Sequence, residues 1–304
     1  MNNLLISFLP ILIMFVCFAF LIGLLAFAKK NHRRGRRNPL TSDLLRNPGE
    51  SLRNQVDEAS IDLEGNALAL VIVPSVLYTQ LITQNYFQQK DITSSSIFST
   101  LLIGFVGIAF ISYRIVSSMR KRQSLRLGLE CEMAVGQELN QLMLLGCRVY
   151  HDFPAQDFNI DHIVIGPAGV YAVETKGRAK PDKGRGTEDA KVVYDGKALR
   201  FPGWTETEPI AQAKRQAQWL ANWLQSAVGQ SISVKPALAL PGWFIDRQGR
   251  DMVVFNSKNP GFLATPRGER VLSAEMIQRV AHQVEQRCRT VEPLSYCKKQ
   301  KSEK

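Results

Sequence analysis

The chain has 304 residues, which is enough for one globular domain with additional segments. Its formal net charge of +11 at pH 7 would ordinarily suggest a nucleic-acid-binding protein, but the excess lies in three places, Lys29–Arg37, Arg114–Arg126 and Lys298–Lys304. The rest of the chain is slightly acidic. The net charge therefore bears on membrane topology and on contact with anionic lipid, and it does not indicate DNA binding.

Five cysteines are spread along the chain without a Cys-x-x-Cys pair. An odd number without metal-type spacing predicts free thiols in a reducing compartment. The four histidines are equally scattered, so the sequence gives no indication of a zinc site.

The N-terminal stretch Leu4–Ala28 contains no charged residue and is long enough to cross a bilayer as a helix. A cleaved signal peptide is the alternative, but the stretch lacks a basic n-region and Phe27–Lys30 is a poor cleavage site. We therefore interpret residues 1–28 as transmembrane helix 1. Residues 29–66 follow as a cytoplasmic basic cluster and linker, with a short amphipathic helix around Leu52–Leu63.

Two further apolar stretches predict transmembrane helices at residues 67–83 and 96–117. The first is short and contains Pro74, so by itself it also fits an interfacial segment. With only two spans, the basic clusters after the first and last spans would lie on opposite sides of the membrane. Three spans put both clusters inside, which the positive-inside rule favours. The sequence thus predicts an integral protein of a bacterial inner membrane, with a cytoplasmic C-terminal half.

The stretch Asn159–Lys176 predicts a β-hairpin. Its first part is rich in β-branched residues that alternate in direction. Gly166–Gly169 predicts a four-residue turn in which both glycines take positive φ. Val170–Val173 is apolar throughout, which is typical of a strand buried on both faces.

Three charged residues interrupt this hairpin, and their spacing predicts a shared site. Glu174 and Lys176 are two residues apart, so their side chains leave the same face of a strand. Asp161 on the neighbouring strand is expected at the same level. Carboxylate oxygens are the ligands that Mg²⁺ prefers, and a nearby lysine can serve a metal-bound water. The alternative is structural: Asp161 caps a strand and the other two residues form a solvated strand end.

The string Ile160–Lys176 closely resembles the core hairpin of the nuclease-related domain (NERD) family, a branch of the PD-(D/E)xK nuclease superfamily. The likeness covers residues 128–256. It implies an α/β fold with a PD-(D/E)xK nuclease-like mixed sheet flanked by helices, preceded here by the N-terminal helical transmembrane region. It further implies that Asp161 and Glu174 bind Mg²⁺ or Mn²⁺, that Lys176 is the catalytic lysine, and that the substrate is nucleic acid, with DNA expected.

Two more residues match the family pattern. Glu132, in the predicted helix Gly128–Leu145, corresponds to the glutamate of the family's opening helix, although Cys131 stands where the family often has glycine. Gln212, in the predicted helix Pro209–Val228, corresponds to a family glutamine, although Glu208 replaces the preceding asparagine. The resemblance implies that Glu132 and Gln212 assist catalysis. A solvated carboxylate is the alternative for Glu132.

The remaining residues of this region are interpreted from their local pattern. Gln216 and Gln218 are predicted to lie on the surface. Gly177–Lys191 is predicted to be a mobile loop in which Arg178 and Lys180 either contact phosphate or are ordinary solvated charges.

Short strands are predicted in much of the C-terminal half, at residues 148–153, 192–194, 198–201, 234–240 and 252–256. Residues 257–304 are predicted to hold a closing helix, Leu272–Arg289, and a charged tail.

The favoured function is a membrane-anchored, metal-dependent nuclease acting on the cytoplasmic side. The rival is a non-catalytic, membrane-tethered module that binds nucleic acid or protein. The pattern leaves the oligomeric state open.

Overall fold

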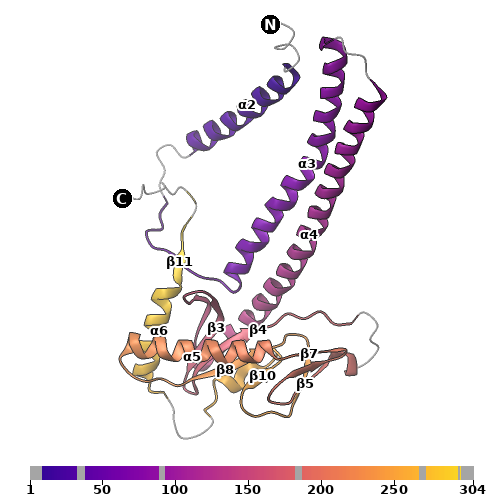
Figure 1. Cartoon of the computed structure of the whole chain (residues 1–304). Coiled ribbons are helices and arrows are strands. Elements are labelled where there is room, and N and C mark those ends of the chain that lie inside the picture. The colour runs from indigo at the N-terminus through magenta and orange to yellow at the C-terminus, as the bar shows by residue number, and fades with distance from the viewer. Residues whose placement is uncertain are drawn as a thin grey trace. The chain divides into compact units, whose positions relative to one another are not determined.

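The computed structural model describes residues 9–32, 38–88, 93–181, 187–266, 272–293 and 295 (Figure 1). The chain forms two compact units, each built from separated segments. Unit 1 contains Met1–Ser42, Glu58–Arg122 and Pro293–Lys304, and unit 2 contains Asp43–Asp57 and Gln123–Glu292. Part of the predicted basic cluster, residues 33–37, and the predicted charged tail, residues 297–304, lie outside the described residues.

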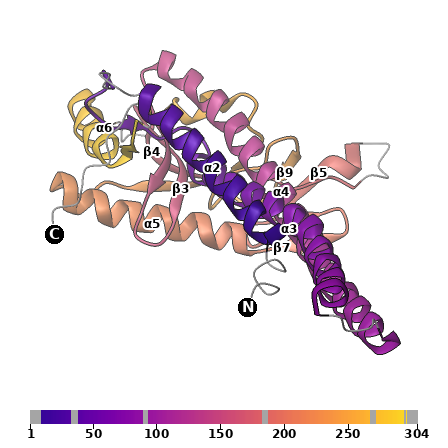
Figure 2. The same ribbon diagram turned by 90° about the horizontal axis from the view of Figure 1, so that it is seen from above.

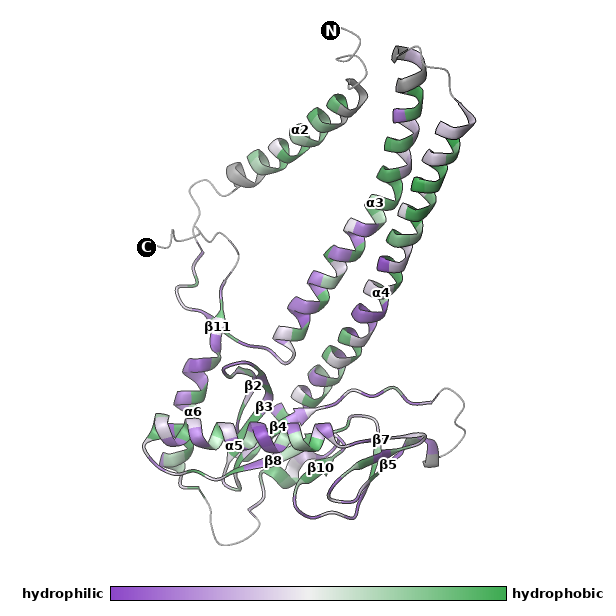
Figure 3. Cartoon of the chain, in the orientation of Figure 1, coloured by the Kyte–Doolittle hydropathy of each residue, from purple (hydrophilic) through white to green (hydrophobic). Residues whose placement is uncertain are grey.

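Unit 1 is helical. It holds α2 (Leu9–His32) and most of α3 (Glu50–Gln88) and α4 (Ser94–Asn140). Two helices, Glu50–Thr83 and Ser94–Leu145, are long and apolar enough to cross a membrane, and Phe15–Ala28 is a shorter apolar helix. Hydrophobic residues of α3 gather toward its C-terminal end, and those of α4 gather toward its N-terminal end (Figure 3).

Both long helices run through boundaries that the sequence analysis placed between separate elements. The predicted linker helix at Leu52–Leu63 and the predicted span at residues 67–83 are parts of the single helix α3. The predicted span at residues 96–117 is likewise continuous with the predicted helix from Gly128, as α4. Residues 117–127 contain no glycine or proline and several good helix formers, so nothing in the local sequence ends the helix there.

Contacts within unit 1 show that α3 and α4 pack antiparallel. A methyl group added to Gly104 would lie 3.4 Å from Leu77, and one added to Gly107 would lie 3.7 Å from Val73. Nearer the other end of the pair, the Arg122 Nε donates to the Ser60 hydroxyl over 2.8 Å. Glycines thus allow close approach of the two helices where both are apolar.

Unit 2 is built on a five-stranded mixed sheet in the order β10-β8-β4-β3-β2. The strands are β2 (Arg148–Pro154), β3 (Asn159–Gly166), β4 (Gly169–Thr175), β8 (Val234–Ala239) and β10 (Val253–Phe255). Pairing is antiparallel among β2, β3 and β4, and parallel among β4, β8 and β10. The predicted α/β class, with a mixed sheet flanked by helices, is confirmed, and the predicted hairpin supplies its central strand, β4.

Helices cover both faces of this sheet (Figure 2). The helices α5 (Glu208–Val228) and α6 (Ala274–Cys288) bury their apolar sides against one face. The end of α4, the 3₁₀ helix η1 (Gln141–Leu145) and the 3₁₀ helix η3 (Pro260–Leu263) cover the other. The central strand is therefore enclosed on both faces, as its apolar sequence predicts.

Two smaller sheets complete unit 2. One has the order β7-β6-β5-β9 and packs in a third core cluster, which includes Tyr194 and Trp243 and is shared with α5, β8 and β10. Its strands are β5 (Lys191–Tyr194), β6 (Leu199–Phe201), β7 (Trp204–Glu206) and β9 (Phe244–Arg247), and the 3₁₀ helix η2 (Thr187–Ala190) precedes them. The other sheet pairs β1 (Leu44–Leu45) with β11 (Arg289–Val291).

The turn of the β3–β4 hairpin is tighter than predicted. Gly166 pairs with Gly169, so only two residues connect the strands. Gly169 has φ +116, whereas Gly166 is not among the residues with positive φ. Gly166 instead admits Cys147, because a methyl group added to it would lie 2.4 Å from the Cys147 sulfur. Positive φ at both glycines was therefore a wrong prediction.

Candidate active site

The register of the β3–β4 hairpin places two acidic residues opposite each other. His162 pairs with Val173, so the next position in the same register sets Asp161 opposite Glu174. Alternation along the strands turns both side chains, and that of Lys176, toward the face that α5 covers, the face on which Ile163 also packs. The predicted residues therefore share one face at one end of the central strands.

Glu174 is the most enclosed of these groups, with only 2% of its side chain exposed. One carboxylate oxygen lies 2.6 Å from the Lys176 ammonium. The other accepts a hydrogen bond of 2.6 Å from the side-chain amide of Gln216. A buried carboxylate needs such partners, because its desolvation is otherwise expensive.

Asp161 is held by the backbone of the neighbouring strand. The Thr175 N–H donates to its carboxylate over 2.7 Å. Burial raises the pKa of Asp161 well above its usual range, and the nearby charges of Glu174 and Glu132 raise it further. The Thr175 hydrogen bond and the Lys176 charge lower the pKa. Two carboxylates facing each other thus favour a proton or a cation between them.

Glu132, on α4, joins the same electrostatic cluster. Burial raises the pKa of Glu132 to about 8, with further increases from the charges of Asp152 and Glu174 and a decrease from Lys176. Glu132 lies in the part of α4 that belongs to unit 2. A methyl group added to Gly177, directly after Lys176, would stand 2.9 Å from the sulfur of Cys131. The helix therefore packs closely against the end of the strand that carries the site.

Two of the glutamines of α5, Gln212 and Gln216, differ from the sequence interpretation. Gln216, predicted to lie on the surface, is 2% exposed and contacts both Glu174 and the Asn159 carbonyl. Gln212 is half-buried, and no hydrogen bond to the site is found for it. The surface prediction for Gln216 was wrong. A signal was present, since position 216 falls between Ala213 and Leu220 on the apolar side of the helix.

Asp152 was missed by the sequence interpretation. On neighbouring strands, His151 pairs with His162 and Phe153 pairs with Ile160. Asp152 lies on β2 between these two pairs, so it is opposite Asp161. Its carboxylate is buried and paired with Arg46. Nothing in the local sequence marks Asp152, because its partners come from a segment about 100 positions earlier in the chain.

The basic residues after the hairpin have partners of their own. The Arg178 guanidinium makes two hydrogen bonds, of 2.8 and 2.7 Å, to the Glu206 carboxylate. Lys180 lies 5.8 Å from the ring centre of Trp243 and is exposed. Of the two predicted phosphate contacts, Lys180 is thus the more accessible. Residues 182–186 of this predicted loop lie outside the described residues.

The opposite face of the sheet carries a buried histidine pair. The Nδ1 atoms of His151 and His162 lie 2.9 Å apart, and His151 Nε2 lies 2.9 Å from the Asn140 side-chain oxygen. Burial lowers the pKa of His151 to about 4 and lowers that of His162 as well. Both imidazoles are therefore neutral near pH 7 and help to fill the interior.

The donor set at the end of β3 and β4 fits a hard divalent cation. In the part of the chain that the structure describes, no three His, Cys, Asp or Glu side chains are arranged to hold a metal. Mg²⁺, however, needs only one or two carboxylates beside water and substrate oxygens. The side-chain oxygen of Gln216 is also buried without a hydrogen-bond partner, so it can accept one from a bound water.

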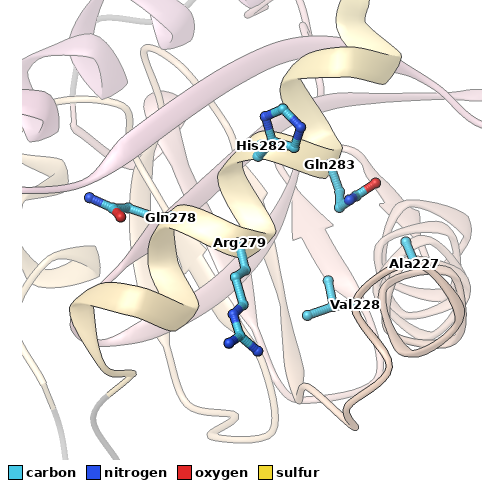
Figure 4. Close-up of a pocket in the computed structure, with 6 residues that line it drawn as sticks. All are labelled: Ala227, Val228, Gln278, Arg279, His282 and Gln283. Carbon is cyan, nitrogen blue, oxygen red and sulfur yellow. The ribbon is translucent and has the colours of Figure 1, made fainter.

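A hollow of about 350 Å³ lies elsewhere, between the end of α5 and the side of α6 (Figure 4). Its lining residues are Ala227, Val228, Gln278, Arg279, His282 and Gln283. It contains none of the candidate site residues and no acidic side chain, so it offers no oxygen ligand set for a divalent cation.

Comparison with known proteins bears on this site in one way. No curated protein and no solved structure matches the chain. A family model does match, over residues 127–241, and its description is nuclease-related domain (NERD). The matched residues contain Glu132, Asp161, Glu174, Lys176, Gln212 and Gln216. Residues 127–241, which contain the central strands and the acidic cluster, thus match the nuclease-related domain family.

Proposed function

We propose that the protein is a metal-dependent nuclease, held at a membrane, that hydrolyses phosphodiester bonds of nucleic acid, with DNA as the first substrate to test. The single observation that carries the proposal is the arrangement of Asp161, Glu174 and Lys176 on one face at the end of the central strands. The nuclease-related match over the same residues supports it.

Each residue has a role that follows from its environment. Asp161 and Glu174 would hold a divalent cation, which would supply Lewis-acid chemistry and lower the pKa of a bound water. Lys176 keeps its ammonium 2.6 Å from Glu174 and has further N–H groups with which to orient the attacking water. Gln216 holds Glu174 in place and offers its free oxygen to the same water. Glu132, whose pKa is raised to about 8, can hold a proton beside these groups, and Gln212 is proposed to assist as well.

The rival function is a non-catalytic module that binds nucleic acid or protein. One observation favours it: both oxygens of Glu174 already have partners, Lys176 and Gln216, so the carboxylate is satisfied without a cation. A cation must displace or share at least one of these contacts. The two functions are distinguished by whether Mg²⁺ changes the protein.

The test is cleavage of labelled single- and double-stranded DNA and RNA by the full chain in detergent, with and without Mg²⁺ or Mn²⁺. Asp161→Asn and Glu174→Gln should lower cleavage at least about 100-fold, because direct ligands matter more than the residues that orient them. Lys176→Met should lower it similarly while Mg²⁺ still raises the melting temperature, because that variant keeps both ligands.

A matched control is the ion pair between Lys191 and Asp246, 3.3 Å apart in the other sheet. Lys191→Met and Asp246→Asn should leave cleavage unchanged. If no metal supports cleavage and Mg²⁺ shifts the melting temperature of wild type and Asp161→Asn equally, the rival function is favoured.

Membrane anchoring belongs to the same proposal. It rests on the two helices that are long and apolar enough to cross a membrane and on the placement of the basic clusters. We propose three spans, at residues 1–28, 67–83 and 96–117, with the C-terminal half in the cytoplasm of a bacterial cell. A reporter after Lys304 should then be cytoplasmic and one within residues 83–96 external. A cytoplasmic signal from the second reporter would rule out this topology.

A further inference from the structure

The segment Arg46–Ser51 lies far outside the residues that match the nuclease-related family, yet it belongs to the same compact unit as the sheet. It follows β1, which pairs with β11 at the end of the domain, and it leads into the first turn of α3. The Arg46 N–H donates to the Cys288 carbonyl over 3.1 Å. This hydrogen bond holds the first residue of the segment, Arg46, against unit 2.

The turn Pro48–Gly49 packs directly against the face of α4 that carries Glu132. Gly49 is buried and has φ +71. A methyl group added to it would stand 2.5 Å from the Leu129 side chain and 3.5 Å from a Glu132 carboxylate oxygen. A methyl group added to Gly136 would lie 2.5 Å from Pro48. The turn therefore forms one wall around the Glu132 side chain.

The same segment holds Asp152 through four hydrogen bonds, all to Oδ2. Two come from the Arg46 guanidinium, one of them 2.9 Å from Nε. The other two come from Ser51, 2.8 Å from its backbone N–H and 2.9 Å from its hydroxyl. Asp152 is 3% exposed and sits at φ +47, a strained conformation for a residue with a side chain. A buried aspartate in this conformation needs such partners to stay ordered.

From Ser51 the contacts continue to Glu174. The Ser51 hydroxyl also accepts a hydrogen bond from the Asn159 side chain. The Asn159 carbonyl accepts one of 3.3 Å from Gln216, whose side-chain amide also holds Glu174. Asn159 precedes Asp161 by two residues on β3. An unbroken path thus joins the segment to one proposed metal ligand and to the strand that carries the other.

We propose that Arg46 and Ser51 are positioning residues of the active site, and that hydrolysis depends on them because they fix Asp152 and Asn159 beside the proposed metal ligands. This inference rests on the proposed nuclease function. The competing account is a strap that stabilises the fold and has no effect on the site. The two accounts differ in what happens to catalysis while the protein remains folded.

The test uses the full chain in detergent and measures kcat and the Mg²⁺ concentration for half-maximal cleavage, at a temperature where circular dichroism shows every variant folded. Ser51→Ala removes the hydroxyl and keeps the backbone N–H to Asp152, so it is the mildest variant. We expect it to lower kcat about 10- to 100-fold, the range found when a residue that orients ligands is lost. Ser51→Thr, which keeps the hydroxyl, should restore most of the rate.

Arg46→Met should have a larger effect than Ser51→Ala, since it leaves Asp152 buried without its cation. Arg53→Met is the matched control, because Arg53 is an exposed arginine in the first turn of α3, the helix that contains Ser51. It should leave both kcat and the Mg²⁺ dependence unchanged.

The inference is overturned if Ser51→Ala lowers the melting temperature but leaves kcat and the Mg²⁺ dependence unchanged. Absence of wild-type cleavage with any metal is a failure of the proposed function, and the Mg²⁺-induced rise in melting temperature then decides the inference. A smaller rise in Ser51→Ala than in wild type supports it. Equal rises, or no rise in wild type, overturn it.

Discussion

Glu174 has a different neighbour at each carboxylate oxygen, so the contribution of each neighbour can be measured separately. Gln216→Leu removes the amide that lies 2.6 Å from one oxygen and leaves a buried charged acceptor short of a partner. We expect a loss of about 1–3 kcal/mol in the free energy of unfolding, measured in urea without metal. Gln212→Leu, on the same helix, should change it by less than about 0.5 kcal/mol. Similar losses in the two variants would contradict the structural difference between these glutamines.

Glu132 predicts a pH dependence of stability. Its pKa is raised from 4.5 to about 8 in the folded protein, mainly by burial. Folding therefore favours the protonated form of the Glu132 carboxyl group. The stability that Glu132 contributes is complete below pH 4.5 and is lost as the pH rises through about 8.

Glu132→Gln should make the stability of the folded protein depend less steeply on pH. Metal-free wild type should melt at progressively lower temperature between about pH 5 and pH 9, and the variant should lose less over the same range. Parallel curves for the two proteins would mean that Glu132 is ionised at neutral pH. The melting temperature of Glu132→Gln should still fall somewhat as the pH rises, because the pKa of Asp161 is raised too.

Residue spacing predicts only the site residues that lie close together along the chain, whereas Glu132 is predicted from the family resemblance. Asp161, Glu174 and Lys176 follow from strand alternation and one tight turn, which fix their shared face. Gln216, which holds Glu174, and Arg46, which holds Asp152, lie on distant elements, so spacing alone does not reveal them. Gln216 could have been found from the apolar periodicity of α5, and Arg46 could not.

At the scale of elements, the long elements were predicted correctly and the short strands only in part. The β3–β4 hairpin, α5 and α6 are long and periodic, and the predicted ranges agree closely with the structure. Among the strands of two to four residues, β5, β6 and β10 were predicted, whereas β1, β7, β9 and β11 were missed. So short a strand carries little periodicity, and its pairing depends on a partner elsewhere in the chain.

The second sheet depends on a close approach of two backbones, and this gives a sharp prediction. A methyl group added to Gly249 would stand 2.4 Å from the backbone of Gly196, where no side chain can move aside. Gly249→Ala should therefore destabilise the protein by about 1–3 kcal/mol, measured by urea unfolding.

Gly261→Ala is its control, since nothing lies within 4 Å of a methyl group at that position. The control should be neutral or slightly stabilising, because alanine restricts the unfolded chain. Equal effects of Gly249→Ala and Gly261→Ala would show that the stability change at position 249 comes from the lost backbone freedom of glycine. The close approach of Gly249 to Gly196 would then not be its cause.

For the whole molecule, the division into units is the feature that the sequence pattern does not predict. Residues 29–66 were interpreted as a basic cluster and linker, yet Asp43–Asp57 belong to the unit that carries the sheet. Only the folded chain brings β1 to β11. The resemblance to the nuclease-related domain begins near residue 128, so it too gives no reason to expect that residues 43–57 belong to this unit.

A fragment that starts at Gln123 should therefore be less stable than the complete unit. It lacks Arg46, which leaves Asp152 buried without its cation, a loss of about 3–5 kcal/mol. For a unit of this size that corresponds to a fall of about 10 °C in melting temperature. This fragment is to be compared with a chain that keeps the complete unit and in which a turn of about four residues replaces residues 61–121. Such a short turn can join the ends because Ser60 and Arg122 are in contact. Equal melting temperatures would contradict the role of the early segment.

The pairing of β1 with β11 also sets an order of events during synthesis. Leu44 pairs with Val291, so the first strand of the unit leaves the ribosome long before its partner exists. Pairing between residues so distant in the chain forms late in folding. A chain that ends before Arg289 has no strand with which to hold Leu44 and Leu45 in place. Completion of translation is therefore a condition for an ordered site, and shortened chains should be recognised by proteases as unfolded in this unit.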